Sequence, residues 1–406
     1  MERRVVITGL GIWSCLGTNL DEVRQSLYSG KSGIIFSQAR KDAGFRSALC
    51  ADVPKADLKK YLSRDLRKLM PEEAQYGYLA TIQALEHAKL DQDFLDQNEV
   101  GVIYGNDSVA EATMQALDKF RQAGSTAACG SGAIFQSMNS TVTMNLATLL
   151  HLRGINLTAS AACASGSHSV GLGYLLIKDG LQDCIICGGA HEANMFSVAS
   201  FDGLMAFSTR EDEPTKASRP FDRDRDGLVP GGGAATLVLE SYEHAVKRGA
   251  PILAEIVGWG FSGNGDHIST PNVAGPTRSL ELCLKNGGIN PRDIGYINAH
   301  ATSTHAGDGR EALAIANIFG DYRVPVTSTK SQTGHEMWMA GASELIYSIL
   351  MMKNDFIGGS LNFENPDEDT ACINVIPETR EAHFDMFLSN SFGFGGTNSS
   401  LIIKNL

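Results

Sequence analysis

Short apolar segments of β type alternate with helix-length periodic segments through most of this 406-residue sequence. This alternation is typical of α/β proteins whose sheets are largely parallel. The predicted strands cover residues 100–104, 156–159, 184–187, 235–239, 252–257 and 294–297, and the predicted helices cover residues 72–88, 165–180, 307–319 and 343–352.

The length of the chain, with 43% hydrophobic residues, is enough for one large α/β unit with two halves. A glycine-rich run at 230–233, followed by a strand, suggests a transition near residue 250. We therefore expect an N-terminal half at 1–250 and a C-terminal half at 251–406.

The charge and cysteine content narrow the class of protein. Lys and Arg number 34 against 46 Asp and Glu, and a net charge of −12 argues against generic nucleic-acid binding. The eight cysteines show no disulfide-framework spacing. No apolar run reaches the roughly 18 residues that a membrane-spanning helix needs, and residues 1–5 lead into a β-type run rather than a signal-peptide core. We expect a cytoplasmic protein that binds neither nucleic acid nor membrane.

Two motifs suggest sites that their contexts do not favour. Cys184 and Cys187 have CxxC spacing, but they lie in a β-branched run without a second CxxC, so we expect a buried strand and no metal. Gly9 and Gly11 follow a strand as in dinucleotide-binding loops, yet Ser14 replaces the third glycine. A nicotinamide cofactor is therefore not expected.

Cys163 is the strongest candidate nucleophile. It lies where an apolar segment meets small residues and then a predicted helix. The N–H groups and the positive end of the dipole at a helix N-terminus favour thiolate over thiol. Far downstream, His300, Lys330 and His335 lie in small, polar, turn-like runs close after β-type segments, and complete a Cys-His-Lys-His set in chain order.

This set resembles the β-ketoacyl-acyl carrier protein synthases of the thiolase-like superfamily, the elongating condensing enzymes of type II fatty acid synthesis. The resemblance covers almost the whole chain. It includes the runs at 4–11, 216–222 and 225–227, and the C-terminal run 390–398. It implies a five-layer thiolase fold of two similar halves, and decarboxylative condensation of an acyl chain with malonyl-acyl carrier protein.

The resemblance also assigns roles. Cys163 would carry the acyl chain as a thioester, while neutral His300 and His335 would stabilise the enolate that forms when carbon dioxide leaves. The backbone N–H groups of Cys163 and Phe394 would form the oxyanion hole. Lys330 would be buried and need an anionic partner. An ion-pair network would fix the geometry and tautomers of the histidines, and its acids would be Asp308, Glu311 and Glu344.

Further family positions concern the substrate and its carrier. Thr302 and Thr304 match residues that hydrogen-bond a phosphopantetheine arm, which belongs to the carrier protein, so no cofactor of the enzyme itself is implied. Phe392 and Phe394, among glycines, match a gate between acyl pocket and entrance. A basic patch that docks the acidic carrier protein is matched by Arg64, Arg67 and Lys68. A second such patch is missing, because residues 124–132 contain no Lys or Arg.

The sequence also departs from the family pattern. Ala301 replaces the usual glycine after the first histidine, and Trp338 and Met339 stand where glycine and alanine are usual. Such bulk near the active site displaces neighbours or reshapes the pocket. Ser108 adds a hydroxyl at the expected far end of the acyl pocket. These changes fit a specialised polyene or polyketide chain as well as an ordinary fatty acid.

Two other functions fit the sequence less well. A non-decarboxylating thiolase needs a second cysteine in the C-terminal glycine loop, and residues 393–396 contain none. A chain-length factor, the non-catalytic partner of an active synthase, lacks the nucleophile that Cys163 supplies. We expect an acyltransferase that forms a homodimer, or a heterodimer with a related ketosynthase-like subunit.

Overall fold

Two half-sheets of the same strand order form the centre of the protein. The computed structural model describes residues 3–406, so residues 1 and 2 of the predicted first half lie outside it. The first half-sheet has the order β5-β4-β6-β7-β1 and the second β10-β9-β14-β15-β8, with β12 (Asn374–Val375) added beside β10. Numbered within its own half, each sheet reads 3-2-4-5-1.

The strands of the first half are β1 (Val5–Trp13), β4 (Val100–Gly105), β5 (Asn156–Ala159), β6 (Cys184–His191) and β7 (Gly233–Ser241). Those of the second are β8 (Ala254–Gly263), β9 (Tyr296–Asn298), β10 (Pro325–Thr327), β14 (Met386–Gly393) and β15 (Thr397–Lys404). In each half four strands run in one direction and one strand, β7 or β15, runs antiparallel to its two neighbours. A short antiparallel pairing of β1 with β8 joins the halves. The strand order begins again at β8, and the division of the chain near residue 250 stays a prediction.

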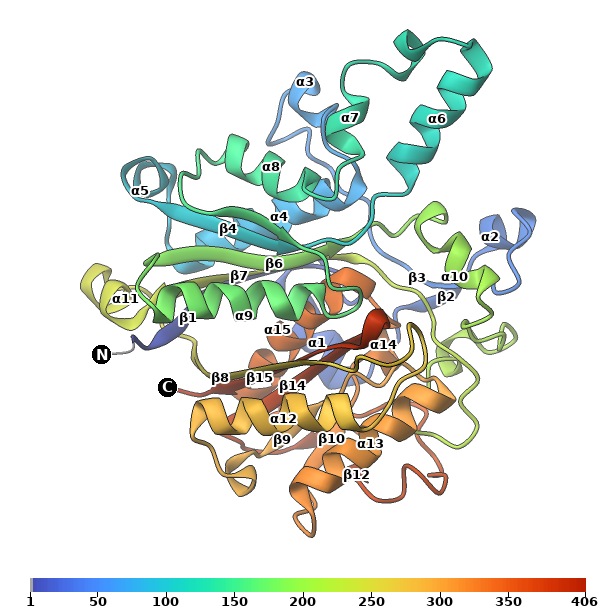
Figure 1. Ribbon diagram of the computed structural model, residues 1–406, viewed down its shortest axis with the longest axis vertical. Coiled ribbons are helices and arrows are strands. Elements are labelled where there is room, and N and C mark those ends of the chain that lie inside the picture. Colours follow the sequence, from blue (N-terminus) through green and yellow to red (C-terminus); the bar gives the residue numbers. More distant parts are fainter. Residues whose placement is uncertain (1–2) are drawn as a thin grey trace.

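Helices form three layers around these half-sheets (Figure 1). The outer layers contain α4 (Glu72–Ala88) and α8 (Thr141–Leu149) on one side, and α12 (Ala274–Gly287) and α13 (His305–Phe319) on the other. Between the sheets lie α9 (Ser165–Lys178) and α15 (Ala340–Lys353). This five-layer arrangement confirms the predicted thiolase-like α/β fold. The predicted strands and helices are all present, and most differ only in where they end.

The remaining elements are short or peripheral. The helices are α1 (Leu20–Ser29), α2 (Gln38–Asp42), α3 (Arg64–Arg67), α5 (Gln92–Gln97), α6 (Glu111–Ala123), α7 (Ala133–Gln136), α10 (Ala199–Gly203), α11 (Tyr242–Arg248) and α14 (Lys330–Thr333). Two small sheets pair β2 (Ile34–Phe36) with β3 (Leu49–Ala51), and β11 (Phe356–Ile357) with β13 (Arg380–Glu381). Both α6 and α7 project away from the layers (Figure 1).

Close packing accounts for the glycine motif that resembled a dinucleotide-binding loop and for the CxxC pair that resembled a metal site. A Cβ on Gly9 or Gly11 would come within 2.2 or 1.9 Å of a carbonyl oxygen of α4, so these glycines let β1 approach that helix. Cys184 and Cys187 are buried in β6, as predicted, and are free thiols.

Candidate active site

A sharp turn between β5 and α9 places Cys163. Ala162 has a φ of +46°, and the Ser165 hydroxyl accepts a hydrogen bond from the Ala161 N–H and donates one to the Ala162 carbonyl. A Cβ on Gly166 would lie 2.9 Å from the backbone nitrogen of Ala342, so the small residue brings α9 against α15. Cys163 therefore sits just before a central helix, between the two half-sheets.

Burial dominates the chemistry of the Cys163 thiol and raises its pKa to about 12. The positive charge of Lys330 acts in the opposite direction, as do hydrogen bonds from the backbone N–H groups of Cys163 and Phe394. The predicted preference for thiolate is therefore wrong for the resting protein, because desolvation outweighs the helix terminus. The two N–H groups assigned to the oxyanion hole do point at the sulfur.

One cavity of about 290 Å³ brings most of the predicted site together. It is lined by residues from both halves of the chain, among them Cys163, His300, Thr302, Thr304, His335, Phe392 and Phe394. Up to 231 positions of sequence separate these residues, so the fold and not the local sequence creates the site.

The two histidines face each other within this cavity. His300 follows β9 and His335 follows α14, and their ring centroids are 5.3 Å apart with the planes at 86°. Burial, and next the charge of Lys330, lower the pKa of both imidazoles well below the usual value, so both are neutral near pH 7. Among the described residues, Nδ1 of His300 and both ring nitrogens of His335 have no hydrogen-bond partner. Neutral, unpartnered imidazoles are suited to binding a substrate oxygen.

The expected buried lysine lies at the start of α14 with an acid beside it. Nζ of Lys330 donates to Oε1 of Glu344 on α15, and both side chains are 1% exposed. Burial raises the pKa of Glu344 to about 7, although Lys330 lowers it.

Glu311 holds the His300 turn through the backbone. Its two carboxylate oxygens accept the N–H groups of His300 and Ala301, at 2.9 and 2.7 Å. Burial raises the pKa of Glu311 to about 7, against these hydrogen bonds. The expectation that acids fix the histidine tautomers is wrong in one respect. Within residues 3–406 no carboxylate bonds Nδ1 of either ring, so Glu311 fixes position rather than protonation.

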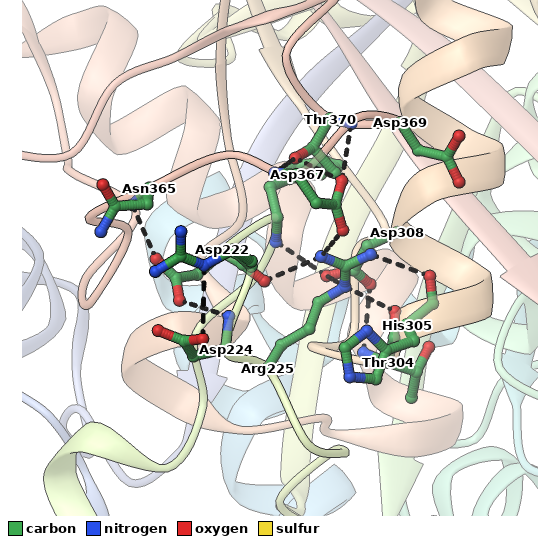
Figure 2. A network of polar contacts seen from close by, with 12 residues as sticks. Asp222, Asp224, Arg225, Thr304, His305, Asp308, Asn365, Asp367, Asp369 and Thr370 are labelled. Atoms are coloured by element: carbon green, nitrogen blue, oxygen red, sulfur yellow. Dashed lines mark hydrogen bonds and ion pairs between the residues drawn. The ribbon is translucent and has the colours of Figure 1, made fainter.

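Asp308 and a buried arginine secure the turn that carries the two threonines. The guanidinium of Arg225 donates to the carbonyl oxygens of Thr304 and His305 and to the carboxylate of Asp367, as Figure 2 shows. Its Nε lies 3.8 Å from Asp308, whose Oδ1 accepts the Thr304 N–H. Burial raises the pKa of Asp308 to about 6, although Arg225 lowers it. The Oγ1 atoms of Thr302 and Thr304 are 3.2 Å apart.

Aromatic rings surround the approach to Cys163. Phe394 is 38% exposed and stacks on Phe201 of α10, with centroids 5.9 Å apart. Phe392 lies 5.9 Å from the His300 ring. Gly395 and Gly396 have φ values of +76° and +71°, which glycine adopts without strain, so this loop requires them.

The residues that depart from the family pattern lie in different surroundings. The methyl group of Ala301 packs in the apolar cluster of the second half. Trp338 packs beside Cys163, whereas Met339 packs in the cluster between the half-sheets. Ser108 is not among the residues that line the cavity with Cys163, and its hydroxyl accepts a hydrogen bond from the Trp338 indole. Its position at the far end of the acyl pocket stays a prediction.

The predicted docking residues lie on and beside α3, away from the cavity. Arg64 and Lys68 are exposed and Arg67 is partly buried. Lys68 pairs with Asp65 at 3.1 Å on the surface.

Four residues near the site were not predicted from the sequence. Arg225 and Phe201 belong to the network and the aromatic wall described above. His191 lies edge-on to Trp338, and burial lowers its pKa to about 3. Glu336, next to His335, accepts hydrogen bonds from Ser343 and Tyr347, and burial raises its pKa to about 8. Glu336 could have been identified from the sequence, because it is a charged residue within an apolar run.

Two general features of residues 3–406 bear on function. No helix there combines the length and apolarity that crossing a bilayer requires. No group of three or more His, Cys, Asp or Glu side chains in that range has an arrangement that would hold a metal ion.

Comparison with known proteins adds independent evidence. A family model described as β-ketoacyl synthase, N-terminal domain, matches residues 2–245, and the corresponding C-terminal domain matches residues 253–364. The 3-oxoacyl-[acyl-carrier-protein] synthase 1 of Haemophilus influenzae is 41% identical over 405 residues, which cover 99% of each chain.

Solved structures agree with this similarity. A β-ketoacyl synthase from Burkholderia phymatum superimposes with a TM-score of 0.96 at 37% identity, and the ishigamide ketosynthase/chain length factor with 0.92 at 31%. Both alignments cover 100% of each chain.

Proposed function

The chain belongs to the β-ketoacyl synthase family, and from this premise we infer that it is a 3-oxoacyl-acyl carrier protein synthase. It is an acyltransferase that elongates an acyl chain by condensation with a malonyl unit. The observation that carries this function is the single cavity in which Cys163, His300 and His335 meet.

The first half-reaction moves the acyl chain onto the enzyme. Sγ of Cys163 attacks the thioester carbonyl of the acyl-carrier protein, and the backbone N–H groups of Cys163 and Phe394 stabilise the oxyanion. The carbon–sulfur bond to the carrier breaks, and the carrier thiol takes up the proton that Cys163 loses. Because the resting sulfur is a thiol, its proton leaves only as the attack proceeds.

The second half-reaction makes the new carbon–carbon bond. The malonyl thioester loses carbon dioxide, and the electron pair of the broken bond passes into an enolate whose oxygen His300 and His335 bind. The enolate carbon attacks the Cys163 thioester, which gives a 3-oxoacyl-carrier protein. The sulfur leaves as thiolate and is reprotonated by water. Burial, and next the charge of Lys330, keep both histidines neutral, so each ring retains one N–H for donation to the enolate oxygen.

The carrier protein would reach the cavity from the side of the threonine turn. Thr302 and Thr304 line the cavity, and their hydroxyl groups can form further hydrogen bonds with the amide groups of the phosphopantetheine arm. We assign Arg64, Arg67 and Lys68 to docking of the acidic carrier, because they lie on and beside α3, with Arg64 and Lys68 exposed. A catalytic thiol must stay reduced, which agrees with a cytoplasmic location.

An exposed apolar surface fits a second ketosynthase-like subunit. On α6, Met114, Leu117 and Phe120 recur every three residues and are 43%, 46% and 42% exposed. Nearby elements add Ile134, Phe135, Met138 and Leu157, the last of these on the edge strand β5. An exposed apolar patch beside an unpaired strand edge is characteristic of an interface. We propose that a homodimer, or a heterodimer with a related subunit, forms through this surface.

The alternative functions are not favoured. The C-terminal glycine loop has no second cysteine for a thiolase, and a chain-length factor would lack Cys163. The ishigamide structure is described as a ketosynthase/chain length factor, which supports a heterodimer as one form of the assembly.

The test is formation of product from purified components. Acyl-carrier protein and malonyl-carrier protein should yield one carbon dioxide and a 3-oxoacyl-carrier protein two carbons longer, as read by mass spectrometry. Release of carbon dioxide without the longer product would instead support the chain-length-factor function. A product formed without carbon dioxide release would support the thiolase.

A further inference from the structure

The indole of Trp338 fills the space directly behind the wall of the catalytic cavity. It packs in an apolar cluster with Cys163, Val198 and Phe207, and is 6% exposed. Its backbone has no room to move, because a Cβ on Gly166 or Gly189 would lie 3.0 or 2.6 Å from its carbonyl oxygen. The main chain of residue 338 is therefore wedged between α9 and β6.

Phe201 separates this indole from the cavity. Its ring lines the cavity and lies 5.9 Å from Phe394 and 6.3 Å from Trp338, while Phe207 is nearly parallel to it at 6.4 Å. With rings on three sides, Phe201 cannot turn away from Cys163 unless a neighbour gives way. The Trp338 ring is tilted by 50° against that of Phe201, whereas Phe394 and Phe207 stack on it.

A hydrogen bond fixes the indole in this position. Nε1 of Trp338 donates to the Ser108 hydroxyl at 3.2 Å, and the ring stands edge-on to His191 with centroids 5.5 Å apart. A buried indole N–H needs a partner, and Ser108 supplies it. Met339 points elsewhere, into the cluster between the half-sheets. Of the two bulky neighbours, only Trp338 backs the cavity.

We propose that Trp338, held by Ser108, sets the depth of the acyl pocket by keeping Phe201 in place. The acyl chain on Cys163 then has room only as far as Phe201, so the enzyme accepts short acyl chains and rejects longer ones. This inference rests on the acyl transfer proposed above. Within a hydrophobic pocket, one methylene too many changes kcat/KM by about 10–200-fold.

The test measures transfer of acyl chains of increasing length from carrier protein to Cys163. The wild-type rate should fall sharply at one chain length. In Trp338→Ala that limit should move to longer chains, and the first chain that the wild type rejects should gain about tenfold or more. Trp338→Phe and Ser108→Ala should shift the limit less, because each keeps a ring behind Phe201 but loses the hydrogen bond. Met339→Ala is the matched control and should leave the limit where it is.

The outcomes separate this inference from the proposed function. An unchanged limit in a Trp338→Ala variant that still transfers short chains would overturn the inference alone, as would a wild type that takes long chains as readily as short ones. If Trp338→Ala does not fold, unchanged limits in both Trp338→Phe and Ser108→Ala overturn it. No transfer to the wild type from any carrier would overturn the proposed function and this inference with it.

Discussion

The imidazole rings of His300 and His335 meet edge to face, with centroids 5.3 Å apart, and both are neutral because burial and Lys330 disfavour their charged forms. Two neutral rings at this spacing can donate to the same substrate oxygen. Such a pair stabilises an enolate without placing a formal positive charge beside it.

Replacing either histidine with alanine should slow condensation about 10²–10³-fold, because the loss of one positioned donor typically costs about 2.7–4 kcal/mol. Acylation of Cys163 should persist, since it depends on backbone donors. Single-turnover assays that follow acylation and condensation separately would show this split. Normal condensation in either variant would remove that histidine from the mechanism.

Lys330→Met should destabilise the fold by about 3–5 kcal/mol, because Glu344 is left as a buried acid without its cation. Lys330→Met with Glu344→Leu should recover part of this loss, since neither charge is then buried. Urea unfolding at fixed protein concentration measures both variants. The control is Lys216→Met, which breaks an exposed pair with Glu213 and should change stability little. Equal losses in both single variants would contradict the role of burial.

Glu336→Gln should flatten the pH dependence of stability. Burial raises the pKa of Glu336 from 4.5 to about 8, so between these values the folded protein keeps a proton that the unfolded chain has released. The unfolding free energy therefore falls as pH rises through this window, by roughly 1.4 kcal/mol per pH unit from this one group. Glutamine removes that contribution. Unfolding free energies of the wild type and Glu336→Gln would be measured from pH 5 to 8. If the free energy falls equally steeply with pH in both, the prediction is refuted.

Leu117→Glu with Phe120→Glu should convert the assembly to monomers, because two charges would enter an apolar interface on α6. Light scattering after size exclusion gives the mass. Leu181→Glu, at a 68% exposed site outside the proposed interface, is the control and should leave the assembly intact. A double variant that keeps the wild-type mass would place the interface elsewhere.

Features that depend on interactions within one segment could be predicted from the sequence. Features that depend on pairings between distant segments could not. The helix at 72–88 was predicted with its observed ends, because its pattern lies within one segment. The repeated strand order was not demonstrated from sequence, since it depends on pairings such as β1 with β7, more than 200 residues apart.

The same distinction applies to the site. Cys163, His300 and His335 carried recognisable local runs, and the structure brings them together. Arg225 was missed because its hydrogen-bond partners other than Asp222 lie 79 to 142 positions away. The prediction that Cys163 is a thiolate was wrong, because the sequence shows its position before a helix but does not show its burial. Trp338 and Met339 looked equivalent in sequence, yet they pack in different clusters.

The most direct test of the central claim is the intact mass of the protein after incubation with acyl-carrier protein alone. The account predicts one added acyl group per chain, located by peptide mapping on Cys163, and no added mass in Cys163→Ala. In that variant, decarboxylation of malonyl-carrier protein should remain, because His300 and His335 are still present. An acyl group on another residue, or acylation of Cys163→Ala at the wild-type rate, would contradict the assignment of Cys163 as the nucleophile.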